Sequence, residues 1–332
     1  MKGKAIVFIK PHEVLLKEIF IPEIKDDEVL IEALFTGISP GTELRTLNGQ
    51  EPNALTFPLI PGYSIVGRVI KRGKKLENLG SGTLVLLNGS CFVKQFSSKW
   101  GGHVSHAVCK SKDLIVIPDG INPSDATIIP MFAVSCHGVK RIMPRKEESA
   151  IIIGQGIIGQ LAGYLLKRIG LKVAAVDLVK ERLEISKKWG ADWTINMADG
   201  KDKIKEIMPE GADIVVEASG VAANVELAGD MLKGRPYSCE DFSMPRLLLL
   251  ASYSEKVCFN YSKFLLEKEP DIITSRGMGY TDQHKAIEIL ANNDLSYFIT
   301  KKFNCENARD AYGQMASNKS SYLGAVFEWA MR

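Results

Sequence analysis

The sequence predicts a two-domain α/β protein in which a doubly wound parallel sheet is inserted into a twisted, barrel-like β-rich domain. Short strand patterns fill the chain up to about Val116, and Gly or Pro interrupts them every few residues, as in "PLIPGYSIVGRVIKRG". From Ala150 onward strands and helices alternate, which is the pattern of a parallel sheet covered by helices. After "DIITSRG" we expect one amphipathic helix, "DQHKAIEILANN", and a strand-like stretch, "YLGAVFEWAM", and both are expected to rejoin the β-rich domain. We therefore expect residues 1–128 and 277–332 to form the β-rich domain and residues 129–276 the inserted one.

The composition is that of an ordinary globular protein. The chain has 332 residues, of which 45% are hydrophobic and 24% charged, so it is long enough for two domains with cores of their own. A net charge of +3 is too small to indicate a nucleic-acid or membrane partner, and no apolar run is long enough to span a bilayer. The first residues lack a signal-peptide core, and the six scattered cysteines include no C-x-x-C pair. These features predict a cytoplasmic protein with reduced thiols.

A glycine-rich turn stands where the first strand of the inserted domain ends, in "SAIIIGQGIIGQLAGYLLKRIG" (149–170). The apolar run before the glycines is typical of a buried parallel strand, and the leucines after them recur at helical spacing. Gly154, Gly156 and Gly159 therefore lie between a strand and a helix N-terminus, where backbone N–H groups and the helix dipole favour a phosphate. The pattern predicts a dinucleotide site.

A second apolar strand ends at Asp177, about 20 residues beyond the glycines, the spacing of a ribose-binding acid. A carboxylate at this place accepts the hydroxyl groups of an adenosine ribose and repels a 2′-phosphate, which favours NAD over NADP. Lys180 and Arg182 follow closely and would soften that preference. The alternative interpretation makes Asp177 the N-cap of the helix that follows in "LVKERLEIS".

The order of the domains and a series of motifs resemble the medium-chain dehydrogenase/reductase superfamily. Within it, the chain is similar to the bacteriochlorophyllide a dehydrogenase-like branch, which carries a G-I-S-x-G-T-E turn, a P-G-Y turn, an N-x-x-C-F-like segment and a tryptophan near the C-terminus. The resemblance implies a GroES-like catalytic domain, a Rossmann cofactor domain, and hydride transfer between a nicotinamide ring and an alcohol or carbonyl carbon. The matching stretches span nearly the whole chain: "GISPGTE", "PGYSIVGRV", "GGHVSHAV", "IPDG", "IIIGQGIIGQLA", "AVDLVKERLEISKKWGAD", "DIVVEASG" and "LGAVFEW".

The resemblance also implies which residues surround the cofactor. It places a residue near Val134 against the nicotinamide, and the backbone after the strand "DIVVE" along a ribose; His137, one turn beyond Val134, is expected to be a helix-packed histidine. The basic residue that often meets the pyrophosphate is replaced near Gly324, which leaves Lys319 and Arg45 as alternatives. The expected cofactor-binding residues are Val134, Gly154, Gly156, Ile157, Ile158, Gly159, Asp177, Lys180, Ala218, Ser219 and Gly220.

The chain departs from the zinc-dependent members of the superfamily. Those members have a cysteine where Ser39 stands, a His-Glu pair where Tyr63 and Ser64 stand, and a cysteine or glutamate near Pro130. Zinc prefers thiolate, imidazole or carboxylate ligands, so we expect no metal here. The four-cysteine structural zinc loop is also absent. His103 and His106 are not expected to rescue a site, because positions three apart on a strand face opposite sides. The full set considered for such a site is Cys91, His103, His106 and Cys109.

Hydroxyl groups would then have to stabilise the alkoxide that develops during hydride transfer. Tyr63 is the first candidate, because its phenol can donate to an oxyanion and, if its pKa is lowered, pass a proton; alternatively it only packs in the cleft. The Ser39 and Thr42 hydroxyls could begin a proton relay, with Glu43 as its base or as a structural carboxylate. Trp100 is expected to form a substrate wall, or else simple core.

These observations predict a metal-independent, NAD-dependent alcohol dehydrogenase or ketoreductase acting on a biosynthetic small molecule. Two alternatives stay open: an NAD(P)H-dependent reductase of enones or quinones with the same fold, and a non-catalytic NAD-binding sensor. The strand "DIITSR" would leave an apolar sheet edge, which relatives pair across a two-fold axis, so we expect a homodimer joined through the cofactor domains. The polar loop Lys233 to Arg246 is a surface lid, a partner contact or a tolerated insertion.

Overall fold

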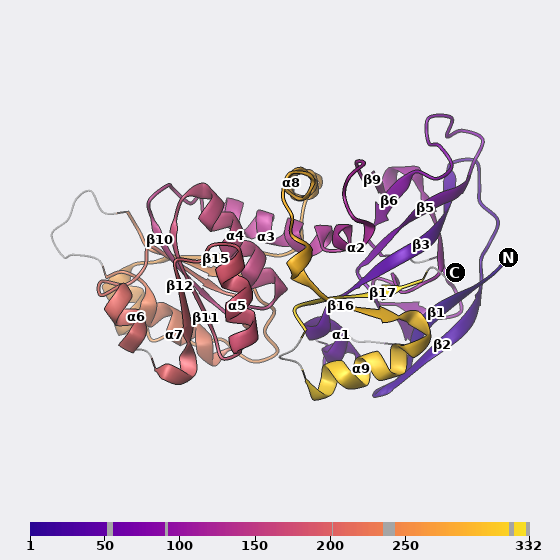
Figure 1. Ribbon diagram of the computed structural model, residues 1–332. Coiled ribbons are helices and arrows are strands. Elements are labelled where there is room, and N and C mark those ends of the chain that lie inside the picture. The colour runs from indigo at the N-terminus through magenta and orange to yellow at the C-terminus, as the bar shows by residue number, and fades with distance from the viewer. Residues whose placement is uncertain (52–55, 90–91, 201, 235–242, 319–321, 330–332) are drawn as a thin grey trace. The chain divides into compact units, whose positions relative to one another are not determined.

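The computed structural model describes residues 1–332 except 52–55, 90–91, 201, 235–242, 319–321 and 330–332 (Figure 1). The chain divides into two compact units, here called the β unit (residues 1–130 and 287–332) and the α/β unit (residues 131–286). The predicted borders at 128 and 277 can be compared with these. The first differs from the observed border by two residues, whereas the second differs more, because the observed border between residues 286 and 287 falls inside the helix α8 (Tyr280–Ala291). Among the described residues, no helix has both the length and the apolar composition needed to cross a membrane.

The β unit is built on a mixed sheet in which the chain's early and late strands lie side by side. Its order is β16-β17-β3-β5-β6-β9, and β8 also pairs with β3. A smaller sheet has the order β2-β1-β4-β7. The strands are β1 (Lys2–Lys10), β2 (Glu13–Phe20), β3 (Glu28–Ile38), β4 (Leu59–Ile60), β5 (Ser64–Arg72), β6 (Leu84–Leu87), β7 (Ser97–Ser98), β8 (His106–Lys110), β9 (Leu114–Val116), β16 (Ile299–Asn304) and β17 (Gly324–Glu328).

Both sheets of the β unit share one apolar core. β1 and β3 contribute Ile6, Phe8 and Ile31, all fully buried, and Val7 is buried as well, so the middle of β1 is covered on both faces. β17 is antiparallel to β3 and parallel to β16, and it carries the fully buried Phe327 into this core. The helices with residues in this unit are α1 (Pro40–Leu47), α2 (Pro123–Ala126) and α9 (Ala308–Ser317), while α3 (Ile129–Arg141) and α8 cross its borders.

The prediction of a single helix and one strand after "DIITSRG" was incomplete. The structure adds β16 and α9 to this part of the chain. α9 buries Ala308, Ala311, Tyr312 and Met315, which lie on one face at positions i, i+3, i+4 and i+7. This spacing is visible in "NARDAYGQMAS" and would have predicted the helix.

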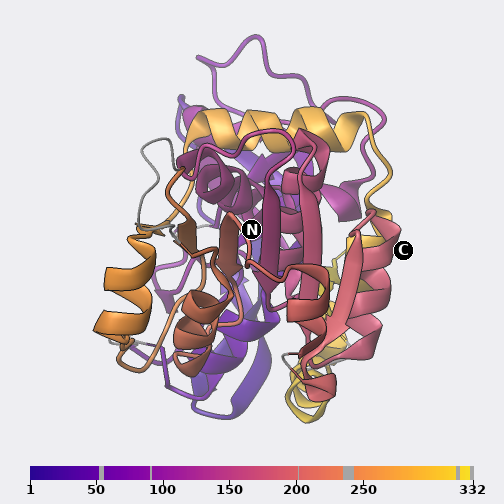
Figure 2. The same ribbon diagram turned by 90° about the vertical axis from the view of Figure 1, so that its left-hand side faces the viewer.

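The α/β unit contains a six-stranded sheet in which every neighbouring pair is parallel. Its order is β12-β11-β10-β13-β14-β15, which is the 3-2-1-4-5-6 order of a doubly wound dinucleotide fold, so the predicted fold class is confirmed. Helices flank the strands on both sides (Figure 2). The elements are β10 (Ser149–Ile153), α4 (Ile157–Ile169), β11 (Lys172–Asp177), α5 (Lys180–Lys188), β12 (Trp193–Asn196), α6 (Asp202–Ile207), β13 (Ile214–Glu217), α7 (Ala223–Met231), β14 (Arg246–Leu249) and β15 (Asp271–Thr274).

The chain order reverses between β10 and β13, so the loops that leave the carboxyl ends of these two strands diverge. Ligands of open α/β sheets bind at this switch point. β10 pairs with β13 from Ala150↔Ile214 to Ile153↔Glu217, so the glycine turn and the segment after Glu217 begin next to each other. The fold therefore puts the predicted dinucleotide turn at the expected edge of the sheet.

Much of the polar loop from Lys233 to Arg246 lies outside the described residues. Its last residue, Arg246, begins β14 and is buried. The Arg246 guanidinium bonds the Glu148 carboxylate at 2.5 Å and the backbone carbonyl groups of Ile142 and Met143 at 2.9 and 3.1 Å. Arg246 thus joins the sheet to the segment that follows α3.

Candidate functional site

The glycine turn between β10 and α4 is shaped by close contacts between backbone segments. Gly154 has φ +89°, and a Cβ there would lie 2.6 Å from the backbone nitrogen of Ser219. A Cβ at Gly159 would lie 1.9 Å from the carbonyl oxygen of Gly154. These two glycines are therefore required by packing within the protein itself.

Gly156 differs from its two neighbours in this turn. It is the N-cap of α4, with φ −69° and ψ 175°, values that any residue adopts. A Cβ at Gly156 would meet no atom within 4 Å. The open space lies at a helix N-terminus, whose first N–H groups have no partner within the helix and whose dipole favours an anion. The turn therefore fits a dinucleotide phosphate, and at Gly156 the fold itself does not demand glycine.

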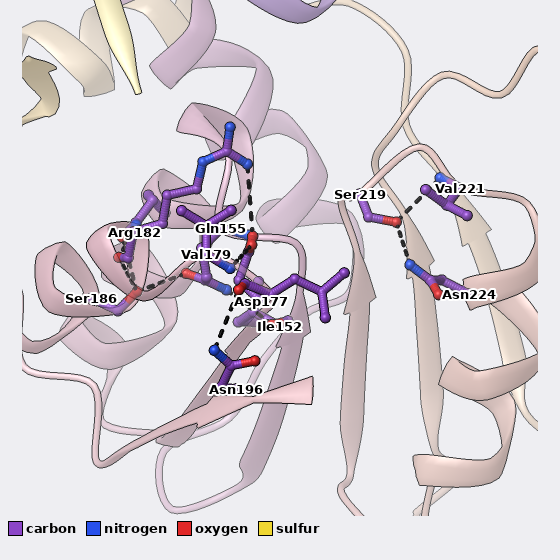
Figure 3. A network of polar contacts seen from close by, with 12 residues as sticks. Ile152, Gln155, Asp177, Val179, Arg182, Ser186, Asn196, Ser219, Val221 and Asn224 are labelled. Atoms are coloured by element: carbon purple, nitrogen blue, oxygen red, sulfur yellow. Dashed lines mark hydrogen bonds and ion pairs between the residues drawn. The ribbon is translucent and has the colours of Figure 1, made fainter. Parts of the chain in front are cut away.

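Asp177 ends β11 directly beside this turn (Figure 3). Its Oδ2 accepts a hydrogen bond from the Gln155 backbone at 2.6 Å, and its Oδ1 accepts one from the Val179 backbone at 2.9 Å. The residue at the N-cap of α5 is Val179, so the alternative interpretation of Asp177 as that N-cap is wrong. The carboxylate instead ties the glycine turn to the end of β11.

Two basic residues follow Asp177, and the structure separates them. Arg182 Nη1 lies 3.8 Å from Asp177 Oδ2, whereas the side chain of Lys180, at the start of α5, is exposed. The guanidinium, rather than the ammonium, is the positive group next to the ribose-binding candidate. Sequence reasoning singled out Lys180 for the site, and the geometry favours Arg182.

Buried hydrogen bonds of the Gln155 side chain hold the glycine turn in place. Gln155 donates from Nε2 to the Ile152 carbonyl at 2.9 Å, and its Oε1 accepts the Ser186 hydroxyl at 3.0 Å (Figure 3). Both side chains are fully buried. Sequence reasoning missed these residues, although a glutamine between two glycines of a buried turn is an unusual polar choice.

The segment Ala218 to Gly220, after β13, is held by a buried carboxylate. Glu217 Oε1 accepts bonds from the Ser219 backbone, at 2.9 Å, and from the Ser219 hydroxyl, while Oε2 accepts the Tyr253 hydroxyl. Burial and the neighbouring Glu217 charge raise the pKa of Tyr253 far above its usual range, so the phenol stays a donor. Ser219 Oγ in turn accepts from the Asn224 amide at 2.9 Å (Figure 3). This wall beside Gly154 is thus well defined, and sequence reasoning missed Tyr253.

On α3, Val134 is half-buried, and the nearby His137 has a more specific contact than the predicted helix packing. His137 Nδ1 lies 3.0 Å from Asp282 Oδ2, and the same oxygen accepts the Gly279 backbone N–H at 2.8 Å. A third of the His137 side chain is exposed, whereas Asp282 is buried. The histidine therefore links α3 to the first turn of α8.

In the β unit, the two turns that carry the candidate hydroxyl groups are separate in sequence. Ser39 precedes Pro40 at the start of α1 and makes no capping hydrogen bond with its side chain; Ser39 and Thr42 are both half-buried. Tyr63 follows β4, and its ring lies on the ring of Trp100, with centroids 4.0 Å apart. Trp100 thus packs on the leading catalytic candidate.

The Tyr63 phenol is held in its protonated form. Burial raises the pKa of Tyr63 to about 12, even though a hydrogen bond with Thr42 works in the opposite direction. The idea that a lowered pKa lets this phenol pass a proton is therefore wrong. Tyr63 can therefore donate a hydrogen bond to an oxyanion near neutral pH, but it is not ionised there and cannot act as a base.

The Glu43 carboxylate is fully buried and surrounded by donors. It accepts the Ser39 backbone N–H at 2.9 Å, His103 Nε2 at 2.9 Å and the Tyr312 hydroxyl at 2.5 Å. These contacts favour the structural alternative for Glu43 over a base at the end of a proton relay. Tyr312, on α9, was not found from the sequence.

The residues at the superfamily's zinc positions do not fit a zinc ion. Ser39 and Tyr63 offer only hydroxyl groups, Pro130 offers no ligand atom, and the Ser64 hydroxyl is committed to the Thr127 carbonyl at 3.0 Å. Over the part of the chain that the structure describes, no group of three or more His, Cys, Asp and Glu side chains could hold a metal.

The second set considered for a metal is also unsuited to one, for a different reason from the one expected. His106 is in β8, but His103 lies before that strand, so the argument from strand alternation does not apply to it. The His103 ring is instead fully buried between Thr36 and Glu43, and burial raises the pKa of the Cys109 thiol to about 12. Cys91 lies outside the described residues.

The alternatives for a pyrophosphate-binding cation stay open. Arg45 Nε lies 3.5 Å from the Glu51 carboxylate, so it already has an acidic neighbour. Lys319 lies outside the described residues.

Each of the two units is matched in part by a family model. The family model for the alcohol dehydrogenase GroES-like domain matches residues 25–119, and the model for a zinc-binding dehydrogenase matches residues 158–235. An uncharacterized zinc-type alcohol dehydrogenase-like protein of Haemophilus influenzae is 27% identical over 350 residues, covering 98% of each chain. An L-threonine 3-dehydrogenase of Vibrio cholerae is 26% identical, covering 99% of this chain and 100% of its own. These matches support the place of the chain in the medium-chain dehydrogenase/reductase superfamily.

Solved structures show the same fold over the full length. A putative zinc-binding dehydrogenase of Sinorhizobium meliloti, bound to NADP, superposes with a TM-score of 0.83 at 19% identity and 99% coverage of both chains. A protein of Escherichia coli described as a short chain alcohol dehydrogenase, complexed with NADH, gives 0.83 at 21% identity, covering 98% of this chain and 99% of its own. At such identities the likeness concerns the fold alone.

Proposed function

We propose that the protein is a metal-independent oxidoreductase that transfers a hydride between NAD(H) and an alcohol or carbonyl carbon of a small biosynthetic molecule. The observation that carries the proposal is the Asp177 carboxylate at the end of β11, bonded to the turn whose Gly156 opens space at a helix N-terminus. The similarity to a threonine dehydrogenase supports the same reaction class. The resemblance to the bacteriochlorophyllide a dehydrogenase-like branch stays a prediction.

In this proposal the nicotinamide ring supplies or takes up the hydride when the cofactor is bound. The first N–H groups of α4 hold the phosphates, and Asp177 accepts the ribose hydroxyl groups. A carboxylate has about four acceptor positions, so Asp177 can accept ribose hydroxyl groups while it keeps its bonds to Gln155 and Val179. The wall from Ala218 to Gly220 borders the same turn.

The hydroxyl groups of the β unit replace a Lewis acid. Tyr63 donates a hydrogen bond to the substrate oxygen, and its raised pKa keeps the phenol protonated near neutral pH. In alcohol oxidation the Ser39 and Thr42 hydroxyls begin a relay in which each takes up one proton and passes its own on, so that the proton of the alcohol ends on water. Trp100 supports the Tyr63 ring and forms a wall for the substrate.

Cofactor choice tests the first half of the proposal. Calorimetric titration should show tighter binding of NADH than of NADPH, because Asp177 repels a 2′-phosphate. Asp177→Ala should narrow the gap, and Arg182→Ala should widen it, since the guanidinium 3.8 Å from the carboxylate favours a phosphate. Lys180→Ala is the control, because that exposed side chain should leave the ratio unchanged. If the unmodified protein binds NADPH more tightly than NADH, the assignment of NAD as the cofactor is wrong.

The chemistry is tested by a cofactor-oxidation screen against ketones, enones and quinones, and by the reverse reaction with secondary alcohols and polyols. Turnover of enones or quinones alone would favour the reductase alternative, and tight NADH binding without any turnover would favour the sensor. With the best substrate, Tyr63→Phe should lower turnover by roughly a hundredfold, or about 3 kcal/mol, as expected for one pre-aimed donor. If Tyr63→Phe stays active while Ser39→Ala or Thr42→Val is dead, the donor is the turn hydroxyl.

We also propose a homodimer joined through the α/β units. β15 pairs with β14 along one side and stands at the end of the sheet order, and its Ile272 is 37% exposed. An apolar strand at a sheet edge is normally covered or paired. A second copy of β15, related by a two-fold axis, would satisfy this edge.

A further inference from the structure

Five polar side chains from distant parts of the chain form one buried network in the β unit. They are Thr36 on β3, Glu43 on α1, His103, Tyr312 on α9 and Trp329 after β17. Thr36, Glu43 and His103 have no exposed surface, and Tyr312 and Trp329 have 1% and 5%. Glu43 and Tyr312 are 269 residues apart in sequence, so only the folded β unit brings them together.

The hydrogen bonds of this network can all be satisfied at once. Trp329 Nε1 donates to Thr36 Oγ1 at 2.8 Å, so the Thr36 hydroxyl is left to donate to His103 Nδ1, also at 2.8 Å. His103 then carries its proton on Nε2 and donates it to Glu43 at 2.9 Å. Burial first, and then the Glu43 charge, raise the pKa of Tyr312 well above its usual range, so this phenol is a permanent donor to the same carboxylate.

The network contacts both turns that carry the candidate catalytic hydroxyls. Glu43 Oε1 accepts the backbone N–H of Ser39, which opens the turn with Ser39 and Thr42. On its other side, the His103 ring lies under Gly62, the residue before Tyr63: a Cβ at Gly62 would come within 2.7 Å of three His103 atoms. The His103 backbone also donates to the Pro61 carbonyl at 2.9 Å.

We infer that Glu43 and His103 are positioning residues, which hold the Ser39–Thr42 turn and the Tyr63 turn in a fixed geometry and are themselves clamped by Tyr312 and Trp329. The inference rests on the proposed function in one respect: the two turns matter to catalysis only if their hydroxyl groups act on the substrate. Neither the two positioning side chains nor the two that clamp them is assigned a contact with substrate or cofactor in the proposed function. Their role is to keep the donors in place, since a donor displaced by about 1 Å loses roughly a hundredfold in rate.

The geometry of the Tyr63 turn can be followed without any substrate. Trp100 lies on the Tyr63 ring, so the resonance of Trp100 in 5-fluorotryptophan-labelled protein reports on this turn. The resonance is assigned with Trp100→Phe, and Trp189 and Trp193 of the α/β unit serve as internal references. Glu43→Gln keeps the size of the side chain but puts an amide N–H₂ against two donors.

Tyr312→Phe is the second variant, in case Glu43→Gln does not fold. It removes only the hydroxyl and keeps the ring against Phe8, with centroids 5.0 Å apart. Tyr322→Phe is the matched control: it makes the same change in the same unit, at a phenol that lies outside the network and donates to Gln314 Oε1 at 3.4 Å on the exposed surface. We expect the Trp100 resonance to move or broaden in Glu43→Gln and Tyr312→Phe and to stay in place in Tyr322→Phe.

Kinetics then separate this inference from the proposed function. In the two network variants kcat should fall about tenfold to a hundredfold while the NADH dissociation constant changes by less than about twofold, because the glycine turn and Asp177, which are proposed to hold the cofactor, belong to the α/β unit. An unchanged Trp100 resonance in the folded variants would overturn the inference whatever the activity. A shifted resonance with unchanged kcat would uphold the positioning and instead refute the catalytic role of the hydroxyl groups.

Discussion

Replacing Gly156 with alanine should damage cofactor binding without damaging the fold. The added Cβ would meet no protein atom within 4 Å, and the backbone at φ −69° suits alanine. Such a replacement commonly stabilises a protein by about 0.4–1 kcal/mol, because it reduces the freedom of the unfolded chain, but alanine is a poorer N-cap than glycine by a similar amount, so the net change in stability should be small. The space that the methyl group enters is the space proposed for the pyrophosphate, so NADH affinity should fall at least about tenfold, or ~1.4 kcal/mol.

Two measurements on the same protein samples test this prediction. Urea unfolding should give a stability for Gly156→Ala within about 1 kcal/mol of that of the unmodified protein, and calorimetric titration should show the loss of NADH affinity. Gly313→Ala is the control, because a Cβ at this exposed position of α9 also meets nothing within 4 Å and should leave NADH binding unchanged. A Gly156→Ala protein that binds NADH normally would refute the placement of the phosphate.

Three further predictions concern stability, metal and assembly. Burial alone would raise the pKa of Asp213, but hydrogen bonds from Ser149 and the Lys233 charge together lower it. The ionised Asp213 carboxylate therefore stabilises the folded protein. This stabilisation is present above the unfolded pKa of about 3.9 and is lost as the pH falls through the lower folded pKa. Asp213→Asn should therefore lower the unfolding free energy by about 1–3 kcal/mol at pH 7 and by less at pH 3, as measured with urea. Elemental analysis of protein purified without added zinc should find far less than one equivalent, and activity should survive a strong chelator; stoichiometric zinc held by His103 or Cys109 would contradict the reading of the ligand positions. Light scattering should find a dimer, and a monomer at all concentrations would exclude the proposed pairing of β15.

The α/β unit could be predicted well because the sequence patterns that indicate it are short and continuous. The apolar strand, the glycine turn and the helix after it lie within one stretch of sequence, and Asp177 ends the very next strand. Contacts inside such a strand–turn–helix unit depend mainly on neighbours in sequence, so residue order carries the geometry. Even here, the preference for Arg182 over Lys180 required the structure, because a helix places side chains two residues apart on different faces.

The β unit shows where sequence patterns stop being informative. Tyr312 and Trp329 look like ordinary core residues in the sequence. Their roles follow from hydrogen bonds to Glu43 and Thr36, which lie near the other end of the chain. The raised pKa of Tyr63 likewise depends on burial, which a turn sequence does not report. The motif could place a phenol at that position but could not say in which protonation state it works.

The position of β17 in its sheet also governs how the chain can fold during synthesis. β17 lies between β16 and β3, yet it is made long after β3. At about 5–20 residues per second, roughly 15 to 60 seconds pass on the ribosome before Gly324–Glu328 can cover the Phe35–Ile38 edge of β3. Meanwhile the α/β unit, which is continuous from 131 to 286, has all of its strands available. The nascent chain therefore has a complete α/β unit while β3 still has an open edge, and an open edge can pair with a neighbouring chain. Yield of this protein in cells should depend on how quickly translation delivers that one strand.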